Sequence, residues 1–323
     1  MKASEFRANL AWTESEAAQY LLPLSQKILA RWFPLHDDPP DPLYHYTNVA
    51  GLLGIIQSDT LWATHSSYLN DPSEIVHAHA LIQLAIKDRL EIAQRPVSRE
   101  LLSRALYAID PNDGMYQYFV SSFCQEPDLL GQWRAYSRSG GGYAIGFDSL
   151  ALQRTANPSP ALTLRRVIYN HDQQRVLISQ TLDDVMDSLE GVAGTKDPTE
   201  ASALIALFVS FLRDHFAEFH FSFKNQAYKD EQEWRLIVQA GVAARDALLR
   251  DVCFREADGV PVPYLALGSD SLAGRPNGQL PLTNIVYGPA IDEQRAVHSV
   301  RMLLDKYGYS HVNMTSSEVP LRA

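Results

Sequence analysis

Cysteine is scarce in this sequence, and metal-binding patterns are missing from it. Its two cysteines, Cys124 and Cys253, lie far apart and form no CxxC pair. This scarcity indicates a reducing compartment and argues against a metal site built from cysteine. The ten histidines include no HExxH motif and no paired zinc spacing, so we expect no metal ion.

Long apolar runs are also missing. No stretch is long enough to span a bilayer, and the N-terminus lacks the apolar core of a signal peptide. We therefore expect a cytoplasmic protein with no membrane partner. The composition, 46% hydrophobic and 20% charged, is that of a globular chain. A net charge of −10 argues against a broad basic surface for nucleic acid, although it permits a local basic groove.

Two common catalytic signatures are absent. The glycines at 140–142 are not followed by Lys-Ser/Thr and precede a strand-like segment, so they indicate a turn and not a phosphate-binding loop. Ser121 and Ser122 lack the Gly-x-Ser-x-Gly pattern of a hydrolase nucleophile.

The order of patterns predicts an α+β fold. Residues 1–40 form an N-terminal helical arm, in which Pro23 is expected to kink or split the helix, and 36–42 form a linker. Residues 41–323 form one α+β domain, because strand and helix patterns alternate too irregularly for a βαβ array. Strands are expected at 43–47, 61–64, 116–123, 143–147, 162–169, 231–238, 263–267 and 282–287. The longer helices are expected at 72–94, with Asp71 as N-cap and Glu74 completing a capping box, and at 172–190, 198–220 and 290–307. Asp197 is expected to open the helix 198–220, Asn48 to cap a short helix after the first strand, and 127–137 to form another short helix.

The central stretch of the chain is Tyr228–Val238, where charges run into an apolar segment. If 231–238 is extended, Glu231, Glu233 and Arg235 share one face and Trp234 packs on the other. Two carboxylates on one face repel each other, which raises the pKa of one of them unless a cation pairs with it or a substrate hydroxyl donates to it. Such an arrangement is typical of a cleft. A half-exposed strand in which Glu231 or Glu233 pairs with Arg235 explains the same pattern.

Other polar residues stand on apolar strands. They are His45, on the aromatic segment 43–47, and the pair Ser121 and Ser122, at the end of the segment 116–123. Taken singly, such a histidine is commonly a core or surface residue, and such a double serine commonly ends a strand. Alternation does not choose between the two serines, because both faces of their strand are apolar.

Three blocks of the sequence carry a family resemblance. They are "LYHYTNVAGLLGIIQSDTLWATHSSYLNDPSE", "FVSSFCQEPDLLGQWRAYSRSGGGYAIGF" and "YKDEQEWRLIV", with "IVYGP" near 285 also similar. Together, over roughly 43–240, they resemble the bacterial domain-of-unknown-function family 2971, a distant relative of the ADP-ribosyltransferases. The opening block is also similar to DNA-modifying members of that superfamily and to the RNA 2′-phosphotransferases.

This resemblance implies an ADP-ribosyltransferase-like fold, with NAD as substrate and a site on three strands. His45 matches the superfamily's His or Arg, Ser121 or Ser122 its Ser or Tyr, and Glu233, preceded by Glu231, its Glu-x-Glu. By that match His45 and a serine bind the riboses, Glu233 stabilises the cation that forms as nicotinamide leaves, and Glu231 orients or deprotonates the acceptor.

The same resemblance extends the list of cofactor-binding candidates. Tyr46, Trp133 and Tyr136 are candidates for stacking on a base or on nicotinamide, although all three equally suit a core. Thr47 and Arg235 complete the list.

Three functions follow from these expectations. The first is ADP-ribose transfer to a nucleic-acid or protein acceptor. The family's associations imply a role in toxin or phage-defence biology. The second is a non-catalytic module of the same fold that binds a nucleotide or a partner. The third is an RNA 2′-phosphotransferase, which needs several basic residues in the cleft, and the acidic net charge disfavours it. Its candidates are Arg134, Arg138, Arg165, Arg166 and Arg235.

Overall fold

The computed structural model describes residues 14–36, 38–69, 73–110, 116–136, 141–156, 162–194, 196–241, 251–257, 259–268, 272 and 278–320. Its α-helices are α1 (Glu14–His36), α2 (Val49–Ser58), α3 (Ser73–Ile92), α4 (Pro96–Ala108), α5 (Leu130–Tyr136), α6 (Ser149–Ala156), α7 (His171–Ala193), α8 (Pro198–Ser222) and α10 (Glu293–Lys306). Its 3₁₀ helices are η2 (Ser66–Tyr68) and η3 (Gln226–Glu231). Its strands are β1 (Leu43–Thr47), β2 (Leu61–His65), β3 (Tyr116–Cys124), β4 (Tyr143–Phe147), β5 (Leu162–Arg166), β6 (Glu233–Gly241), β7 (Val252–Ala257), β8 (Val260–Leu267), β9 (Leu282–Tyr287) and β10 (Asn313–Ser316).

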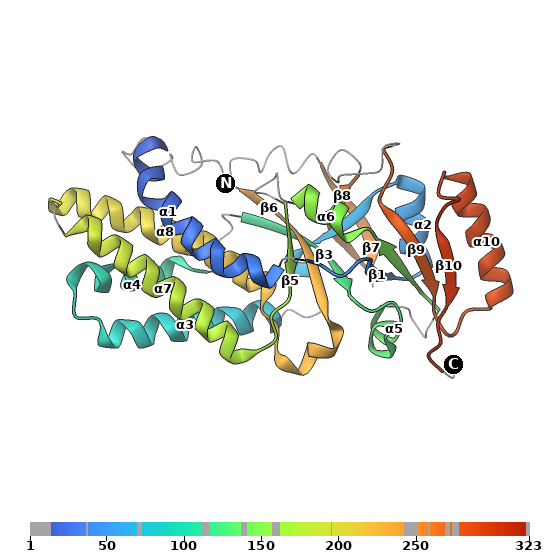
Figure 1. Cartoon of the computed structure of the whole chain (residues 1–323), viewed down its shortest axis with the longest axis horizontal. Coiled ribbons are helices and arrows are strands. Elements are labelled where there is room, and N and C mark those ends of the chain that lie inside the picture. Colours follow the sequence, from blue (N-terminus) through green and yellow to red (C-terminus); the bar gives the residue numbers. More distant parts are fainter. Residues whose placement is uncertain are drawn as a thin grey trace.

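The molecule has a helical half and a sheet half (Figure 1). Helices α1, α3, α4, α7 and α8 form the helical half around a core of their own. The sheet half has α2, α5, α6 and α10 around it. The expected α+β class, with a mixed sheet flanked by helices, is confirmed.

Helix α1 belongs to the helical half. Leu21, Leu24 and Ile28 are buried in its core, and Lys27 and Arg31 form ion pairs with Asp184 of α7. Pro23 does not split this helix, since α1 is a single element; of the two expected outcomes, a split is wrong. Proline removes one helical hydrogen bond, and burial of apolar side chains on both sides of it offsets that loss.

The helix N-caps expected from the sequence are confirmed where the structure describes them. Asn48 caps α2 through Gly51 N, and Asp197 caps α8 through Thr199 N and Glu200 N, as expected. Asp71 and Pro72, the expected start of α3, lie outside the described residues.

The sheet has ten strands, in the order β10-β9-β4-β1-β3-β2-β8-β7, with β6 pairing β3 and β5. Only the β9–β10 ladder among those described is parallel. The sequence patterns missed β7 and β10. Neither strand contains a buried residue, so both lack the apolar alternation that marks a strand in sequence.

The sheet divides along one edge of β3. Strand β6 pairs with β3 from Tyr116 to Cys124 and so occupies one whole edge. The other edge is shared, because β1 pairs with it at Cys124 and β2 pairs with it at Phe119 and Val120. In the described ladders, residues 121–123 of β3 pair with neither. We call this place, where β1 and β2 leave β3 in different directions, the fork.

No described helix is long and apolar enough to cross a membrane.

Candidate functional site

The three strands that carry the predicted site are neighbours. Strand β1 carries His45, β3 carries Ser121 and Ser122, and β6 carries Glu233. Since β3 pairs with β1 on one edge and with β6 on the other, the sequence-predicted residues meet in one part of the sheet.

The ladder register decides which serine faces the carboxylate. Ser122 lies opposite Arg235 and Cys124 opposite Glu233, so these four side chains project from one face. Ser121 lies opposite Leu236 on the other face, which is an apolar core. The Ser122 hydroxyl forms a hydrogen bond with Glu233, whereas the buried Ser121 hydroxyl has no partner among the described residues.

Glu233 lies in a cluster of charged side chains, which we call the ion cluster: Glu74, Lys224, Glu231, Glu233 and Arg235. The Lys224 Nζ is 2.7 Å from Glu74, 2.5 Å from Glu231 and 3.2 Å from Glu233. Arg235 donates from Nε to Glu233 Oε1 at 2.7 Å and from Nη2 to Glu233 Oε2 at 2.8 Å. The same Nη2 is 2.5 Å from Glu74 Oε2.

The ion cluster joins the helical half to the sheet. Glu74 lies in the first turn of α3, Lys224 follows the C-terminus of α8, and Glu233 and Arg235 begin β6. Arg235 also donates from Nη1 to the carbonyl of Phe221 at 3.1 Å, at the end of α8. Pairing and hydrogen bonding of this kind are what allow so many charges to be buried together.

The cluster holds three carboxylates and two cations, and two of the carboxylates, Glu231 and Glu233, have pKa values shifted in opposite directions. Burial alone would raise the pKa of Glu233, but the charges of Arg235 and Lys224 lower it to about 2. Burial raises the pKa of Glu231 above its usual value, although Lys224 opposes the change. The side chain of Glu231 is 32% exposed and that of Glu233 only 8%, so Glu231 is the carboxylate that solvent or a ligand can reach.

Glu231 was expected in an extended strand, which is wrong, although it does lie close to Glu233 as expected. Glu231 ends η3, and Gln232 takes a left-handed conformation with φ 47° before β6 begins at Glu233. Glu231 and Glu233 still converge, because both bind Lys224 and not because they alternate along one strand.

His45 occupies the fork. By alternation its side chain leaves β1 on the face opposite Glu233, and its ring meets the edge of Phe123. The Nδ1 atom lies 2.9 Å from the carbonyl oxygen of Ser122. A carbonyl only accepts, so Nδ1 carries the hydrogen. Burial lowers the pKa of His45, which keeps the ring neutral at pH 7 and leaves Nε2 as an acceptor.

Ser122 therefore links the two predicted catalytic groups, through its carbonyl to His45 and through its hydroxyl to Glu233. The structure brings both groups to one serine but does not bring the imidazole against the carboxylate.

Two of the expected ring-stacking residues are core residues in this structure. Tyr46 and Trp133 are 5% and 0% exposed and pack edge to face at 4.7 Å. The Tyr46 hydroxyl donates to the Glu126 carbonyl and accepts from Leu129 N. Neither ring is exposed in this structure. Both residues were expected to suit a core equally well, and they lie in one here.

The remaining cofactor candidates are half-buried. Tyr136 packs against the same core as Tyr46 and Trp133. Thr47 lies opposite Tyr143 at the end of β1 and beside Gly51 of α2.

One comparison with known proteins gave a match. Residues 132–236 match the family described as "Protein of unknown function (DUF2971)". That description names no activity. Neither the curated proteins nor the solved structures contain a match to the chain.

The DUF2971 match covers part of the site. Lys224, Glu231, Glu233 and Arg235 lie inside it, whereas His45, Ser122 and Glu74 lie outside it.

Two members of the ion cluster were missed in the sequence. Glu74 was interpreted as part of a helix cap, and its carboxylate binds Lys224 and Arg235. Lys224 follows directly after a long apolar helix, and its closeness to Glu231 and Glu233 along the chain was the available signal. No sequence signal indicated the contact between Arg235 and Glu74, because these residues are 161 positions apart.

The arginines proposed for a phosphotransferase cleft are differently placed. Arg165 pairs with Glu218 at 3.1 Å, and Arg235 is held in the ion cluster. Arg134 is exposed on α5, and Arg138 lies outside the described residues. Of this basic set, Arg165 and Arg235 are thus bound to carboxylates.

Proposed function

We propose that this protein binds NAD and transfers its ADP-ribose to a nucleic-acid or protein acceptor, as an ADP-ribosyltransferase-like enzyme. The observation that carries the proposal is that the three motif strands are adjacent, with Ser122 in contact with both His45 and Glu233. The match of 132–236 to DUF2971 supports the family resemblance from which these roles come.

The reaction breaks the bond between the nicotinamide nitrogen and C1′ of its ribose. Nicotinamide leaves with the bonding electron pair, the acceptor's oxygen or nitrogen forms the new bond to C1′, and the acceptor's proton goes to a base. Anionic groups placed beside the developing ribosyl cation stabilise it. The ion cluster, with one more carboxylate than it has cations, supplies that negative charge.

The two glutamates then have separate roles. Glu231 is the partly exposed carboxylate with a raised pKa, which suits the group that receives the acceptor's proton. Glu233 stays ionised because Arg235 and Lys224 lower its pKa, so it contributes a fixed charge. Ser122 and Lys224 hold that carboxylate in place.

The second candidate is a non-catalytic binding module of the same fold. The observation that favours it is the saturation of Glu233, whose two oxygens are bound by Arg235 and Lys224 and which is 6% exposed. In that case the ion cluster joins α3 and α8 to the sheet, and the fork binds a nucleotide or a partner without chemistry.

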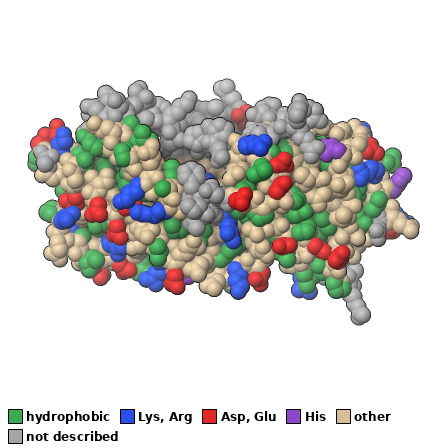
Figure 2. Space-filling model, in the orientation of Figure 1, with side chains coloured by type: hydrophobic (Ala, Val, Ile, Leu, Met, Phe, Trp, Pro, Cys, Tyr) green, Lys and Arg blue, Asp and Glu red, His purple; other side chains and the backbone are tan. Residues whose placement is uncertain are grey.

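The acceptor is best sought without assuming a basic docking surface. On the face shown in Figure 2, acidic and basic side chains are interspersed over both halves, in keeping with the net charge of −10. Single-stranded DNA, RNA and the protein itself are the acceptors to supply.

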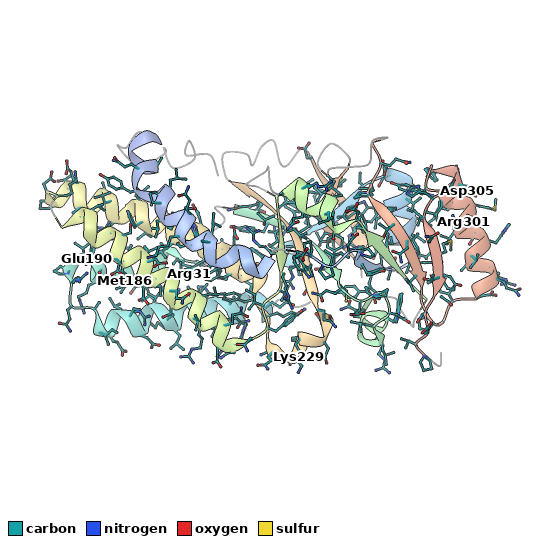
Figure 3. The ribbon with its side chains drawn as sticks, viewed as in Figure 1. Arg31, Met186, Glu190, Lys229, Arg301 and Asp305 are labelled. Atoms are coloured by element: carbon teal, nitrogen blue, oxygen red, sulfur yellow. The ribbon has the colours of Figure 1, made fainter. Side chains whose placement is uncertain are left out.

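The test is a titration with NAD followed by an assay of nicotinamide release by the wild type, Glu231→Gln and Glu233→Gln. The matched control is Glu190→Gln, since Glu190 accepts hydrogen bonds from the Ser98 N–H and hydroxyl in the helical half, far from β6 (Figure 3). The proposal predicts release by the wild type and by the control, with release lost in both other variants. Binding of NAD by all four proteins without release of nicotinamide would favour the non-catalytic module.

A further inference from the structure

Arg255 of β7 is a cation that pairs with no carboxylate among the described residues. Its Nη2 donates to Thr64 Oγ1 at 3.0 Å. Its Nε is buried and has no partner among the described residues. Burial lowers the pKa of Arg255, and no carboxylate in the described part of the chain counters that effect. A buried charge is costly unless it is paired, so an arginine held in this way is suited to an anionic ligand.

The ladders place Arg255 on the same face of the sheet as Ser122 and Glu233. Residues that oppose each other in an antiparallel ladder project to one face, and so do residues two apart in a strand. The path from β6 to β7 runs through paired residues: Ile237, Val120, Thr64, Tyr264 and Cys253. Arg255 follows Cys253 by two residues, and Glu233 precedes Ile237 by four.

Arg255 also lies beside the fork. Its partner Thr64 pairs with Val120, the residue of β3 at which the unpaired stretch 121–123 begins. His45 fills that stretch from the side of β1, and the charge of Arg255 is one of the causes that lower its pKa. The guanidinium and the imidazole therefore approach the fork from opposite branches of the sheet.

We propose that Arg255 and Thr64 form an anion site for a phosphate group, and that the group is the pyrophosphate of NAD. This inference rests on the proposed function for the identity of the ligand. The guanidinium supplies charge and the free Nε–H. Thr64 accepts from Arg255, which leaves its own hydroxyl hydrogen to donate to a phosphate oxygen. A dinucleotide bound here has its phosphates at the β2–β7 side of the fork and its nicotinamide ribose toward Ser122.

The experiment compares Arg255→Met with Arg104→Met, which removes the same charge from α4, where Arg104 pairs with Glu100. The probes are NAD, ADP and nicotinamide riboside, which has no phosphate. We expect Arg255→Met to weaken NAD and ADP binding about 10-fold or more, the loss typical of a hydrogen bond to a charged group. Nicotinamide riboside binding and the control variant stay at wild-type affinity.

A melting measurement separates a binding role from a structural one. Removing a half-buried cation that has no carboxylate partner among the described residues relieves its desolvation, so ligand-free Arg255→Met should melt at or above the wild-type temperature. A melting temperature well below that of the wild type would assign Arg255 to structure instead.

The outcomes distinguish the two proposals. Unchanged NAD affinity in Arg255→Met, with nicotinamide still released, overturns the anion site and leaves the proposed function standing. ADP binding that depends on Arg255, without nicotinamide release from NAD by the wild type, supports the anion site and contradicts the proposed reaction. A wild type that binds neither ADP nor NAD overturns the anion site.

Discussion

Ser122 lies directly opposite Arg235 in the β3–β6 ladder, and this pairing separates two adjacent serines that the sequence could not distinguish. It turns the Ser122 hydroxyl toward Glu233 and the Ser121 hydroxyl into an apolar core.

The two serines should therefore differ on substitution. Ser122→Ala removes a hydrogen bond to a charged group and should cost about 1.5–3 kcal/mol of unfolding free energy. Ser121→Ala removes a buried hydroxyl without a described partner, so stability should stay within about 1 kcal/mol or rise. Urea denaturation of the pair is the measurement. Equal losses would mean that the faces are assigned incorrectly.

Lys224 and Lys229 provide a second matched pair. Lys224 is buried against three carboxylates, whereas Lys229 is exposed in η3, where Figure 3 labels it. Lys224→Met should lower the unfolding free energy by about 3–5 kcal/mol, because it leaves buried carboxylates without one of their cations. Lys229→Met should change it by about 0.5 kcal/mol or less. Denaturant titration measures both, and a small effect for Lys224 would show that the ion cluster does not bind the two halves together.

Glu233 predicts a specific acid sensitivity. Its pKa falls from 4.5 to about 2 on folding, so the unfolded chain takes up its proton at a higher pH than the folded one. The stability that ionised Glu233 contributes is therefore complete above pH 4.5 and is lost as the pH falls toward about 2. The difference in unfolding free energy between wild type and Glu233→Gln should be constant near neutrality and shrink over that window. For Glu100→Gln, which breaks an exposed pair, the difference should be small throughout. A difference that stays level down to pH 2 would contradict the lowered pKa.

His45 predicts a second loss of stability at low pH, in a higher pH range than that of Glu233. Burial lowers its pKa below 6.5, so the folded protein takes up this proton less readily than the unfolded chain. His45 therefore opposes folding increasingly as the pH falls below 6.5. In an NMR titration its ring signal should stay in the neutral form at pH 6.5, where an exposed histidine is half protonated. A midpoint at or above 6.5 would show that the ring is not held neutral in the fork.

Short-range sequence patterns predicted much of the fold. The caps Asn48 and Asp197 and the strands around His45 and Ser122 follow from short-range rules, and the structure contains them. Those rules allowed a split at Pro23, where tertiary packing continues the helix, and extended the strand back to Glu231, where a left-handed Gln232 delays its start to Glu233. Strand β7, which carries Arg255 and contains no buried residue, left too weak an alternation to be found.

The candidate site was less predictable, since its contacts depend on placement across the sheet. Glu233 and the pair Ser121 and Ser122 could be named from the resemblance, but the partner Glu74 comes from another half of the molecule. Trp133 shows the converse problem: an aromatic residue near a suspected site has the same sequence pattern whether it binds a ligand or fills a core.

The most direct test of the central claim is nicotinamide release from NAD by the wild type, Glu231→Gln and Glu190→Gln under identical conditions. We predict release by the wild type and by Glu190→Gln, with a loss of about 100-fold or more in Glu231→Gln, the size expected when a general base is removed. Equal release by all three proteins, or none by a wild type that binds NAD and is supplied with DNA, RNA or protein acceptors, would contradict the proposed transfer of ADP-ribose.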